Sequence, residues 1–298
     1  MTLSQLVPRI ASSVVGLRRG ARGGSGVVLA PGRVLTLSHH LRADEVEVAF
    51  AGGRTARATV AGRDPDLDLA LLDVDTGDAT PISWAGAEVP GIGAPVVAAA
   101  DPGGSGLRVT AGAVSAAPTR LRGRRGRPVE GVLEHTAPLP RGAGGGPLLD
   151  EAGAVLGINA LRQRGGFILA LPASEVRPRA EALLAGRATE PRRLGVAIVP
   201  PRAARRMRRA VGLDDREGLL VRGVAEGGPA AAAGLQRGDL LVAAAGAPLD
   251  GIDALYAAVD AAPQDGPLVL RVVRGAEDLD VAVTVPPAAA APGPEEAP

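Results

Sequence analysis

Short apolar runs, separated at close spacing by Gly, Pro and Asp, make up the chain from about Ser12 to Pro172. In the segment Glu45–Phe50 the apolar residues alternate with others, which is the two-residue period of a strand with one buried face. Other such runs are Gly26–Ala30, Leu69–Val74 and Val96–Ala99. Many short strands without helical windows between them predict an all-β barrel or sandwich rather than alternating βα units.

The first window with helical spacing of apolar residues is Glu175–Ala185, with Gly186 as a stop signal. Four segments are therefore expected: a β-rich domain over 1–186, a linker over 187–192, a second unit over 193–285 and a disordered tail over 286–298. The tail is mostly Pro, Ala and Glu and shows no periodicity. Within the second unit, short strands are expected at Leu219–Val221, Leu240–Val242, Leu268–Val273 and Leu279–Val285, and a helix near Ile252–Val259.

Composition narrows the class of protein. The 298 residues leave room for two domains, and a formal net charge of +1 supplies no general attraction to nucleic acid or to an anionic membrane. The absence of cysteine excludes disulfides and thiolate chemistry. No window approaches the length of a membrane span, and residues 1–22 lack the basic and apolar regions of a signal peptide. We expect a cytoplasmic protein with no membrane contact, no cofactor and no metal.

Three segments carry candidate chemistry, and they follow one another in the order histidine, aspartate, glycine-rich loop. They are Thr36-Leu37-Ser38-His39, Asp66-Leu67-Asp68-Leu69-Ala70 and Gly142-Ala143-Gly144-Gly145-Gly146-Pro147-Leu148. The same order of base, orienting carboxylate and nucleophile is found in chymotrypsin-type proteases.

These segments resemble the HtrA family of trypsin-like serine proteases. The resemblance extends from about Val14 to Pro172 and includes Gly24–Leu29, Asp101–Gly104, Val109–Ser115, Leu156–Asn159 and Gly166–Phe167. It implies a mainly β fold, with a two-barrel trypsin-like domain first and a small α+β domain after it.

The resemblance assigns His39 as the general base and Asp68 as the carboxylate that orients it, with His40 as a competitor for the base. The nucleophile position falls on Gly144, where the family carries serine and this chain has no side chain. Gly142 and Gly144 still suit an oxyanion hole, because that task needs backbone N–H groups. Without a nucleophile, His39 and Asp68 become vestigial, and a protein that is proteolytically inactive is expected.

The residues around Gly144 depart from the family as well: Ala143 replaces Asn, Arg141 replaces Pro, Pro140 replaces Asn and Thr136 replaces Asp. No other serine obviously takes over, since Ser38, Ser105 and Ser115 fall elsewhere in the aligned pattern. The alternative that stays open is an active serine endopeptidase, in protein quality control, with a non-standard nucleophile.

The second unit resembles the PDZ domains attached to such proteases, through Gly218–Val221, Gly227–Ala230, Ala233–Leu235, Gly238–Leu241 and Gly246. A peptide-binding site is expected, with Arg193, Leu194, Gly195 and Val196 forming a backbone nest for a terminal carboxylate and an edge strand. Leu255 and Val259, spaced i,i+4 on the expected helix, are candidates for its side-chain pocket. The alternative is that Gly195 only makes a turn and Leu255 only fills the core.

Two arginine clusters have no role in this scheme. Arg120, Arg122, Arg124, Arg125 and Arg127 lie between two strand-like runs, and Arg202, Arg205, Arg206, Arg208 and Arg209 lie on an expected short helix whose other face carries Ala203 and Met207. Without aromatic stacking platforms, these clusters indicate solvated surface rather than nucleic-acid binding. The expected partners are peptide or protein C-termini and unfolded protein. The N-terminal segment lacks aromatic residues such as trimeric members of the family use, so trimerisation is doubtful.

Overall fold

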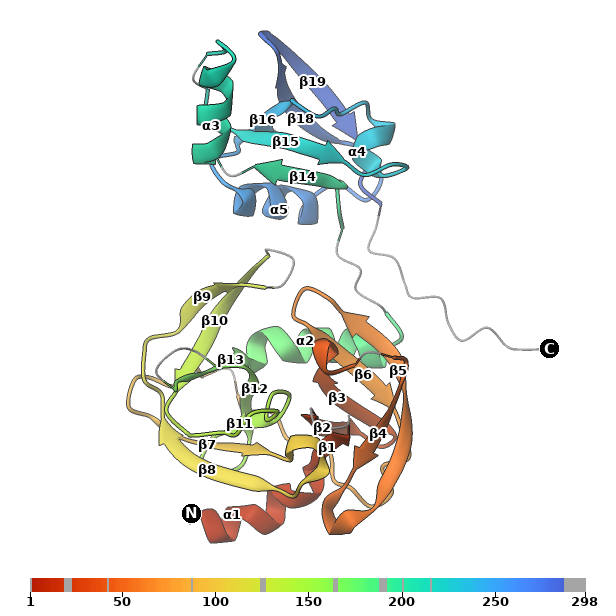
Figure 1. The fold of residues 1–298 in the computed structure, drawn as a ribbon, viewed down its shortest axis with the longest axis vertical. Coiled ribbons are helices and arrows are strands. Elements are labelled where there is room, and N and C mark those ends of the chain that lie inside the picture. Colours follow the sequence, from red (N-terminus) through yellow and green to blue (C-terminus); the bar gives the residue numbers. More distant parts are fainter. Residues whose placement is uncertain are drawn as a thin grey trace, which may run out of the picture. The chain divides into compact units, whose positions relative to one another are not determined.

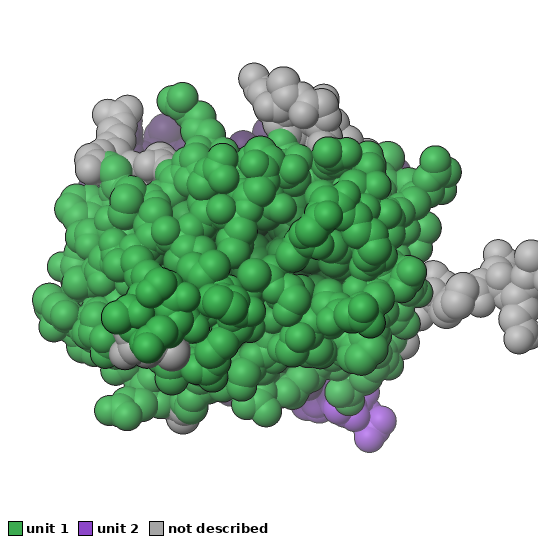
Figure 2. Space-filling model, turned by 90° about the horizontal axis from the view of Figure 1, so that it is seen from below, with its two compact units in different colours: residues 1–189, 290–298 green, residues 190–289 purple. Residues whose placement is uncertain are grey.

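The computed structural model describes residues 2–18, 23–41, 43–86, 88–123, 127–162, 166–187, 192–199, 201–214 and 216–286. Contacts divide the chain into two compact units, with a border between residues 189 and 190 (Figures 1 and 2). Below, unit 1 denotes residues 1–189 and unit 2 denotes residues 190–289. The expected linker residues 188–191 and tail residues 287–298 lie outside the described residues, so the exact domain borders stay a prediction. The mainly β fold class is confirmed.

The first half of unit 1 is a closed barrel with strand order β1-β2-β3-β6-β5-β4. Its strands are β1 (Val14–Arg18), β2 (Gly24–Ala30), β3 (Arg33–Leu37), β4 (Glu45–Ala49), β5 (Thr55–Asp64) and β6 (Leu69–Asp73). The alternation in Glu45–Phe50 produces the strand that was expected, with Val48 buried in the barrel core beside Val15 and Leu72. Short 3-10 helices at Ala11–Ser13 (η1), Ser38–His40 (η2) and Ala51–Gly53 (η3) connect the strands.

The second half of unit 1 is a seven-stranded sheet in the order β8-β7-β11-β12-β13-β10-β9. Its strands are β7 (Pro95–Ala100), β8 (Arg108–Ala113), β9 (Thr119–Arg122), β10 (Pro128–His135), β11 (Pro147–Leu149), β12 (Val155–Arg162) and β13 (Ile168–Pro172), with η4 at Pro102–Gly104. The sheet curls on itself, because the ends of β8 and β10 meet: Ser115 N donates to Glu134 O at 2.9 Å and Thr136 N to Ala113 O at 3.0 Å. Each half of unit 1 therefore buries its own core.

Two helices accompany these sheets. Helix α2 (Ala173–Leu184) matches the expected window and buries Val176, Ala180 and Leu183. Helix α1 (Leu3–Ile10) was not predicted; it is short, and only Leu6 and Ile10, one turn apart, are buried. Both of these side chains join the large core of unit 1, so tertiary packing rather than a long periodic pattern holds α1 in place.

Unit 2 is a sheet in the order β14-β15-β16-β18-β19, with β17 paired to β16. Its elements are β14 (Val196–Val199), α3 (Pro201–Ala210), β15 (Leu219–Val224), α4 (Pro229–Ala232), β16 (Leu240–Ala244), β17 (Ala247–Pro248), α5 (Ile252–Asp260), β18 (Leu268–Arg274) and β19 (Glu277–Val283). Strand β14 ends this order and pairs with β15 alone, so it is an edge strand (Figure 1).

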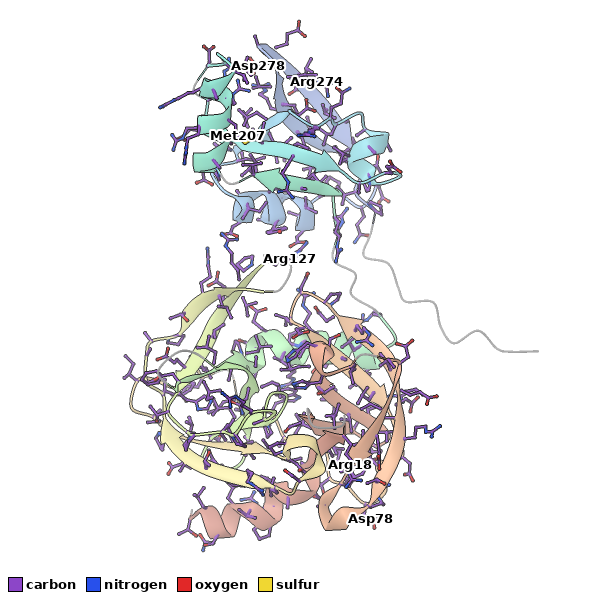
Figure 3. All side chains as sticks on the ribbon, viewed as in Figure 1. Arg18, Asp78, Arg127, Met207, Arg274 and Asp278 are labelled. Carbon is purple, nitrogen blue, oxygen red and sulfur yellow. The ribbon has the colours of Figure 1, made fainter. Side chains whose placement is uncertain are left out.

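Helix α3 uses a different face from the one expected. Ala204 and Arg208, one turn apart, are buried, whereas Ala203 is exposed and Met207 is 51% exposed (Figure 3). The burial of Arg208 explains the difference. Its Nε donates to the carbonyl of Asp214, which lets the stem of the side chain lie against the sheet.

Candidate functional site

His39 and Asp68 are brought together, as the resemblance implied. His39 lies on η2 and Asp68 in the turn before β6, and His39 Nδ1 contacts Asp68 Oδ2. The backbone supports the pair, because His39 N donates to Asp68 Oδ1 at 3.1 Å and Ser38 N donates to Asp68 O at 2.6 Å. The side chain of His39 is 39% exposed and that of Asp68 is 17% exposed, so the imidazole is accessible and the carboxylate is shielded.

The turn that presents Asp68 has an unusual backbone. Asp68 adopts φ of 61°, a left-handed conformation that a non-glycine residue occupies only when its surroundings hold it there. Asp64, which is fully buried, shapes the turn by accepting the N–H groups of Asp66 and Leu67 at 2.9 and 3.0 Å. Asp66 is itself 4% exposed and pairs with Arg127 at 3.2 Å, so it lies in the interior of unit 1. The β9–β10 hairpin supplies this arginine (Figure 3).

The glycine-rich loop is anchored on both sides by backbone hydrogen bonds. Gly144 O accepts Ser25 N at 2.9 Å, and Gly145 N donates to Asn159 O at 2.8 Å. Gly145 adopts φ of 88°, and a Cβ there would lie 2.1 Å from the carbonyl oxygen of Ser25. At Gly146 a Cβ would lie 2.2 Å from Ala99 O. Neighbouring backbone thus approaches Gly145 and Gly146 so closely that any side chain would clash, and both positions require glycine.

Two amides of this loop face no acceptor in the described part of the chain: those of Gly142 and Gly144 donate no hydrogen bond there. Both residues are partly exposed, and Gly142 adopts φ of 82°. Two uncommitted N–H groups two residues apart in an accessible loop are what an oxyanion hole requires. The backbone therefore supports the assignment that the resemblance gave to these glycines, which stays a prediction.

His40, not His39, lies next to residue 144. A Cβ on Gly144 would lie 3.3 Å from His40 Cε1 and 3.4 Å from His40 Nε2, and also 3.3 Å from Leu37 Cδ1. On its other side His40 abuts Gly24, where a Cβ would lie 2.2 Å from Nδ1. The rings of His39 and His40 have centroids 4.3 Å apart. Sequence spacing did not reveal that His40 borders both glycines.

A side chain at residue 144 is compatible with the backbone but tight. Gly144 is not among the glycines with positive φ, so serine is not excluded by its dihedral angle. The contacts of 3.3 to 3.4 Å mean that His40 and Leu37 must move by a few tenths of an ångström to admit a Cβ.

A third histidine, His135 on β10, is fully buried behind the same loop. Its Nε2 contacts Asn159 Oδ1 at 2.8 Å, and Asn159 Nδ2 donates to Pro147 O at 3.0 Å. The backbone N–H of Asn159 also donates to Gly146 O at 2.9 Å. Asn159 therefore links the His135 ring to the glycine-rich loop. Burial lowers the pKa of His135, and the hydrogen bond to Asn159 opposes that shift. The sequence analysis noted that Thr136 replaces an aspartate of the family, but it missed the histidine next to it.

In unit 2 the expected nest lies just before the edge strand β14. Gly195 adopts φ of 77°, and the loop is fixed through its carbonyls: Gly195 O accepts Ala225 N at 2.8 Å and Leu194 O accepts Ala230 N at 2.9 Å. Among the described residues, the amides of Leu194 and Gly195 donate no hydrogen bond. Arg193 is exposed and Val196 is partly buried.

Leu255 and Val259 lie on α5 as expected, and each is 3% exposed. Both belong to the core of unit 2, together with the partly buried Val196 and Ile198 of β14. Leu255 and Val259 thus fill the core first, and a role for them in a peptide pocket stays a prediction.

Arg192, which directly precedes the expected nest, was missed as a structural residue. Its guanidinium donates to the carbonyls of Ala262, Pro263 at 3.0 Å, Val285 at 2.8 Å and Pro286 at 3.2 Å. These bonds join the start of the nest to the end of α5 and to the end of β19. Because the acceptors lie 70 or more residues away in sequence, no local signal announces them.

The arginine clusters are only partly described: Arg124, Arg125 and the side chain of Arg202 lie outside the described residues. Arg120 contacts Glu130 and Arg205 contacts Glu217 at positions that agree with a solvated surface. For Arg127 and Arg208 the expectation was wrong, because their side chains lie in the interior of the two units. No group of three or more His, Asp or Glu side chains within the described ranges is arranged to hold a metal ion. In those same ranges, no helix has the length and apolar character to cross a membrane.

Comparison with known proteins identifies both units. Residues 24–158 match the model of the trypsin-like peptidase domain, and residues 220–274 match the model of the PDZ domain. A probable periplasmic serine endoprotease, DegP-like, of Pseudomonas fluorescens is 32% identical over 269 residues, which is 88% of this chain and 56% of that protein. The periplasmic pH-dependent serine endoprotease DegQ of Escherichia coli is 30% identical over 274 residues, 88% of this chain and 59% of that protein. The chain thus spans a little over half of these curated relatives.

Solved structures agree in fold. The serine endoprotease from Yersinia pestis has a TM-score of 0.74 at 26% identity and covers 96% of this chain and 98% of its own. The HtrA-type protease AlgW with a decapeptide has a TM-score of 0.76 at 23% identity, with the same coverage. The arrangement of a trypsin-like domain followed by a PDZ domain is therefore shown.

The expectation of a cytoplasmic protein was wrong. The relatives that align with most of this chain are named periplasmic endoproteases. The expectation rested on the pattern of residues 1–22 alone. Relatives that match 88% of the chain are stronger evidence of location than this short pattern.

Proposed function

We propose that this chain, an HtrA-family protein with a trypsin-like domain followed by a PDZ domain, binds peptides and unfolded protein without cleaving them. The observation that carries the proposal is the absence of a hydroxyl at Gly144, a residue that borders His40. Without that hydroxyl no acyl-enzyme forms, because the remaining groups supply a base and an oxyanion hole but no nucleophile.

The contacts of the other serines support an inactive site. Ser25 is fully buried, and its Oγ accepts Asp101 N at 3.0 Å. Ser38 Oγ accepts from Arg63 at 2.8 Å, and within the described residues His39 contacts Asp68 and His40 but no hydroxyl group. These contacts support the proposal, because no hydroxyl group among the described residues is hydrogen-bonded to His39.

Peptide binding is assigned to unit 2. The amides of Leu194 and Gly195, which donate to no described residue, suit a terminal carboxylate. Strand β14, whose outer edge pairs with no other described strand, suits an extended chain. One solved structure of an HtrA-type protease carries a decapeptide, which fits this mode of recognition. The PDZ match points to peptide or protein ligands, and we propose that their C-termini are the feature bound.

One observation favours the alternative of an active endopeptidase: the contact between His39 and Asp68 is preserved. A fluorophosphonate serine probe and casein turnover distinguish the two functions. We expect neither labelling nor turnover above a blank. Labelling of one serine, with turnover lost when that serine is replaced, would establish the alternative.

Restoring the hydroxyl measures how much of the site has survived. We expect Gly144→Ser alone to give weak casein turnover, because His40 and Leu37 crowd the new side chain and the flanking residues differ from the family. Adding His40→Val removes the ring that crowds residue 144 and should let the new serine approach the general base. We therefore expect casein turnover to increase by about tenfold or more, since a well-placed general base contributes a factor of this size. Gly91→Ser is the matched control, because a Cβ there meets nothing within 4 Å. Robust turnover from the single change would show that the site is intact apart from one side chain.

A further inference from the structure

We infer that the peptide site proposed for unit 2 selects chain ends with an acidic side chain second or fourth from the end, and that Arg222 of β15 provides this selectivity. The inference rests on the proposed function, because it names the class of peptide that the same edge strand takes. Three features carry it: the two faces of β15, a bulge beside β14 and an arginine without an acidic partner.

Strand β15, the partner of edge strand β14, separates two cores (Figure 1). Val221 belongs to the core that includes Leu255 of α5, whereas Leu220 belongs to a separate core with Ala204 of α3. Because side chains alternate along a strand, Arg222 lies on the face of Leu220 and α3. Arg222 is exposed. The α3 face of the sheet therefore carries a cationic side chain one strand away from the outer edge of β14.

A β-bulge lies at Arg222. Ala197 of β14 is opposite Gly223, and the next residue, Ile198, is opposite Val221, so Arg222 has no residue of its own opposite it on β14. Bulges redirect side chains and are frequent at sheet edges and beside functional sites. Ala197 and Gly223 share one face, since a Cβ on Gly223 would lie 3.9 Å from Ala197 Cβ, and both are small. The guanidinium of Arg222 thus has room to extend across β14 toward its outer edge.

The charge of Arg222 is available to a ligand, because Arg222 forms no ion pair or hydrogen bond with the described part of the chain. Other arginines of unit 2 are paired with carboxylates, namely Arg205 with Glu217, Arg216 with Asp278, Arg271 with Asp280 and Arg274 with Asp239. Near the proposed site, Asp253 and Asp260 lie on α5, and Glu226 lies in the connection after β15. An acidic side chain of a bound peptide is therefore favoured on the α3 face and disfavoured on the α5 face.

The direction of the peptide follows from the position of the nest. Leu194 and Gly195 directly precede β14, so a chain that ends at their amides runs antiparallel to β14. In the proposed site the last side chain faces Leu255 and Val259 of α5, and alternation then directs the second and fourth side chains from the end to the α3 face. Arg222 and the peptide backbone are two strand spacings apart, about 10 Å. An arginine and a glutamate that extend toward each other span this distance and form an ion pair.

The test is isothermal titration of the full chain at pH 7.5 and low ionic strength, about 20 mM, where screening is weak. Acetyl-Ala-Glu-Ala-Glu-Val places both glutamates on the α3 face, acetyl-Glu-Ala-Glu-Ala-Val carries the same charge on the α5 face, and acetyl-Ala-Gln-Ala-Gln-Val is the neutral reference. We expect the first peptide to bind about fivefold more tightly than the neutral one, the upper range for an exposed ion pair. The second peptide should bind no more tightly than the neutral one.

Arg222→Gln removes the charge and keeps a polar side chain. We expect this variant to lose the preference for the first peptide and to bind the neutral peptide as the parent does, which separates selectivity from a structural role. Arg271→Gln is the matched control, because it removes an exposed arginine on β18, three strands from β14, and should keep the preference. Arg222→Glu should reverse the preference and favour acetyl-Ala-Lys-Ala-Lys-Val.

Equal affinity for the two glutamate peptides, or a preference that persists in Arg222→Gln, would overturn the inference and leave the proposed peptide binding standing. The proposed function has its own readout: the C-terminal amide of the neutral peptide should bind about tenfold more weakly than the free acid. Equal binding of amide and acid, or cleavage of a peptide detected by mass spectrometry, would contradict the proposed function. Absence of binding by all the peptides would disprove recognition of chain ends by unit 2, and the inference with it.

Discussion

The loops at Gly142–Gly144 in unit 1 and at Leu194–Gly195 in unit 2 offer the same backbone feature in two different settings. Each contains a glycine of positive φ and two amides with no acceptor among the described residues. The loop of unit 1 borders His40, and it is packed so closely that the next two glycines admit no side chain. The loop of unit 2 borders an edge strand, and at Gly195 the nearest atom to a Cβ is 3.4 Å away.

The difference shows which parts of each site depend on side chains. In unit 1 packing fixes the backbone around the two amides. In the function proposed above, glycine at residue 144 therefore removes the nucleophile without removing these donors. In unit 2 the peptide binding proposed above uses backbone groups, so we expect changes in the surrounding side chains to have less effect on it.

The largest effect expected is the contrast between Gly145→Ala and Gly195→Ala. At residue 145 the added Cβ would lie 2.1 Å from Ser25 O at φ of 88°, so we expect unit 1 to lose about 4 kcal/mol or more. At residue 195 the contact is ordinary, and only the left-handed conformation opposes alanine, by about 1–2 kcal/mol.

Urea unfolding can follow both units in one sample, because Trp84 is the single tryptophan, in unit 1, and Tyr256 the single tyrosine, in unit 2. Equal losses in the two variants would contradict the view that the loop of unit 1 is the more tightly packed one.

A smaller effect is expected from a buried carboxylate that supports unit 2. Asp239 is 1% exposed, accepts Gln236 N at 2.8 Å and pairs with Arg274 of β18 through two contacts of 2.8 Å (Figure 3). The pairing raises the pKa of Arg274, chiefly through the hydrogen bond to Asp239. Asp239→Ala removes a buried carboxylate that accepts hydrogen bonds from the Gln236 amide and from a charged guanidinium, so we expect a loss of about 2 kcal/mol in the transition reported by Tyr256.

The matched control is Asp280→Ala, because Asp280 meets Arg271 at 3.3 Å with both side chains more than half exposed. That change should cost about 0.5 kcal/mol or less. A similar loss from both variants would show that the buried pair does not stabilise unit 2 more than an exposed one.

The smallest effect expected is a dependence of the stability of unit 1 on pH. Burial lowers the pKa of His135, whereas in the unfolded chain it returns to about 6.5. The unfolded state therefore binds a proton first as the pH falls, and unit 1 should lose stability from about pH 7 downward until the folded-state pKa is passed. Unit 2 has no histidine, so the Tyr256 transition should lack this contribution.

His135→Gln isolates the effect by removing the titrating ring. The difference in unfolding midpoint between pH 7.5 and pH 5.5, followed by Trp84 fluorescence, should be smaller in the variant than in the parent. An identical difference in both proteins would assign the pH dependence to other groups of unit 1.

The sequence by itself determined the elements with a clear period and the order of the motifs. Glu45–Phe50 alternates and forms β4, Glu175–Ala185 has helical spacing and forms most of α2, and the spacing around Ile252 gives α5. The motifs around His39 and Asp68 correctly indicated residues that meet in space, because the pattern of a whole domain accompanies them.

Only the tertiary structure decided which side chains surround the glycine-rich loop. His40 borders residue 144 across about a hundred residues of chain, and Arg192 binds carbonyls 70 to 94 residues away. Asp66 is buried where Arg127 of the β9–β10 hairpin pairs with it, and His135 is buried between its strand partners Ile168 and Val114, which are buried themselves. Periodicity shows on which face of its own helix or strand a residue lies. The contacts above depend instead on how separate strands close into a barrel. That closure is the reason why the sequence identified Gly144 and the structure alone showed what lies beside it.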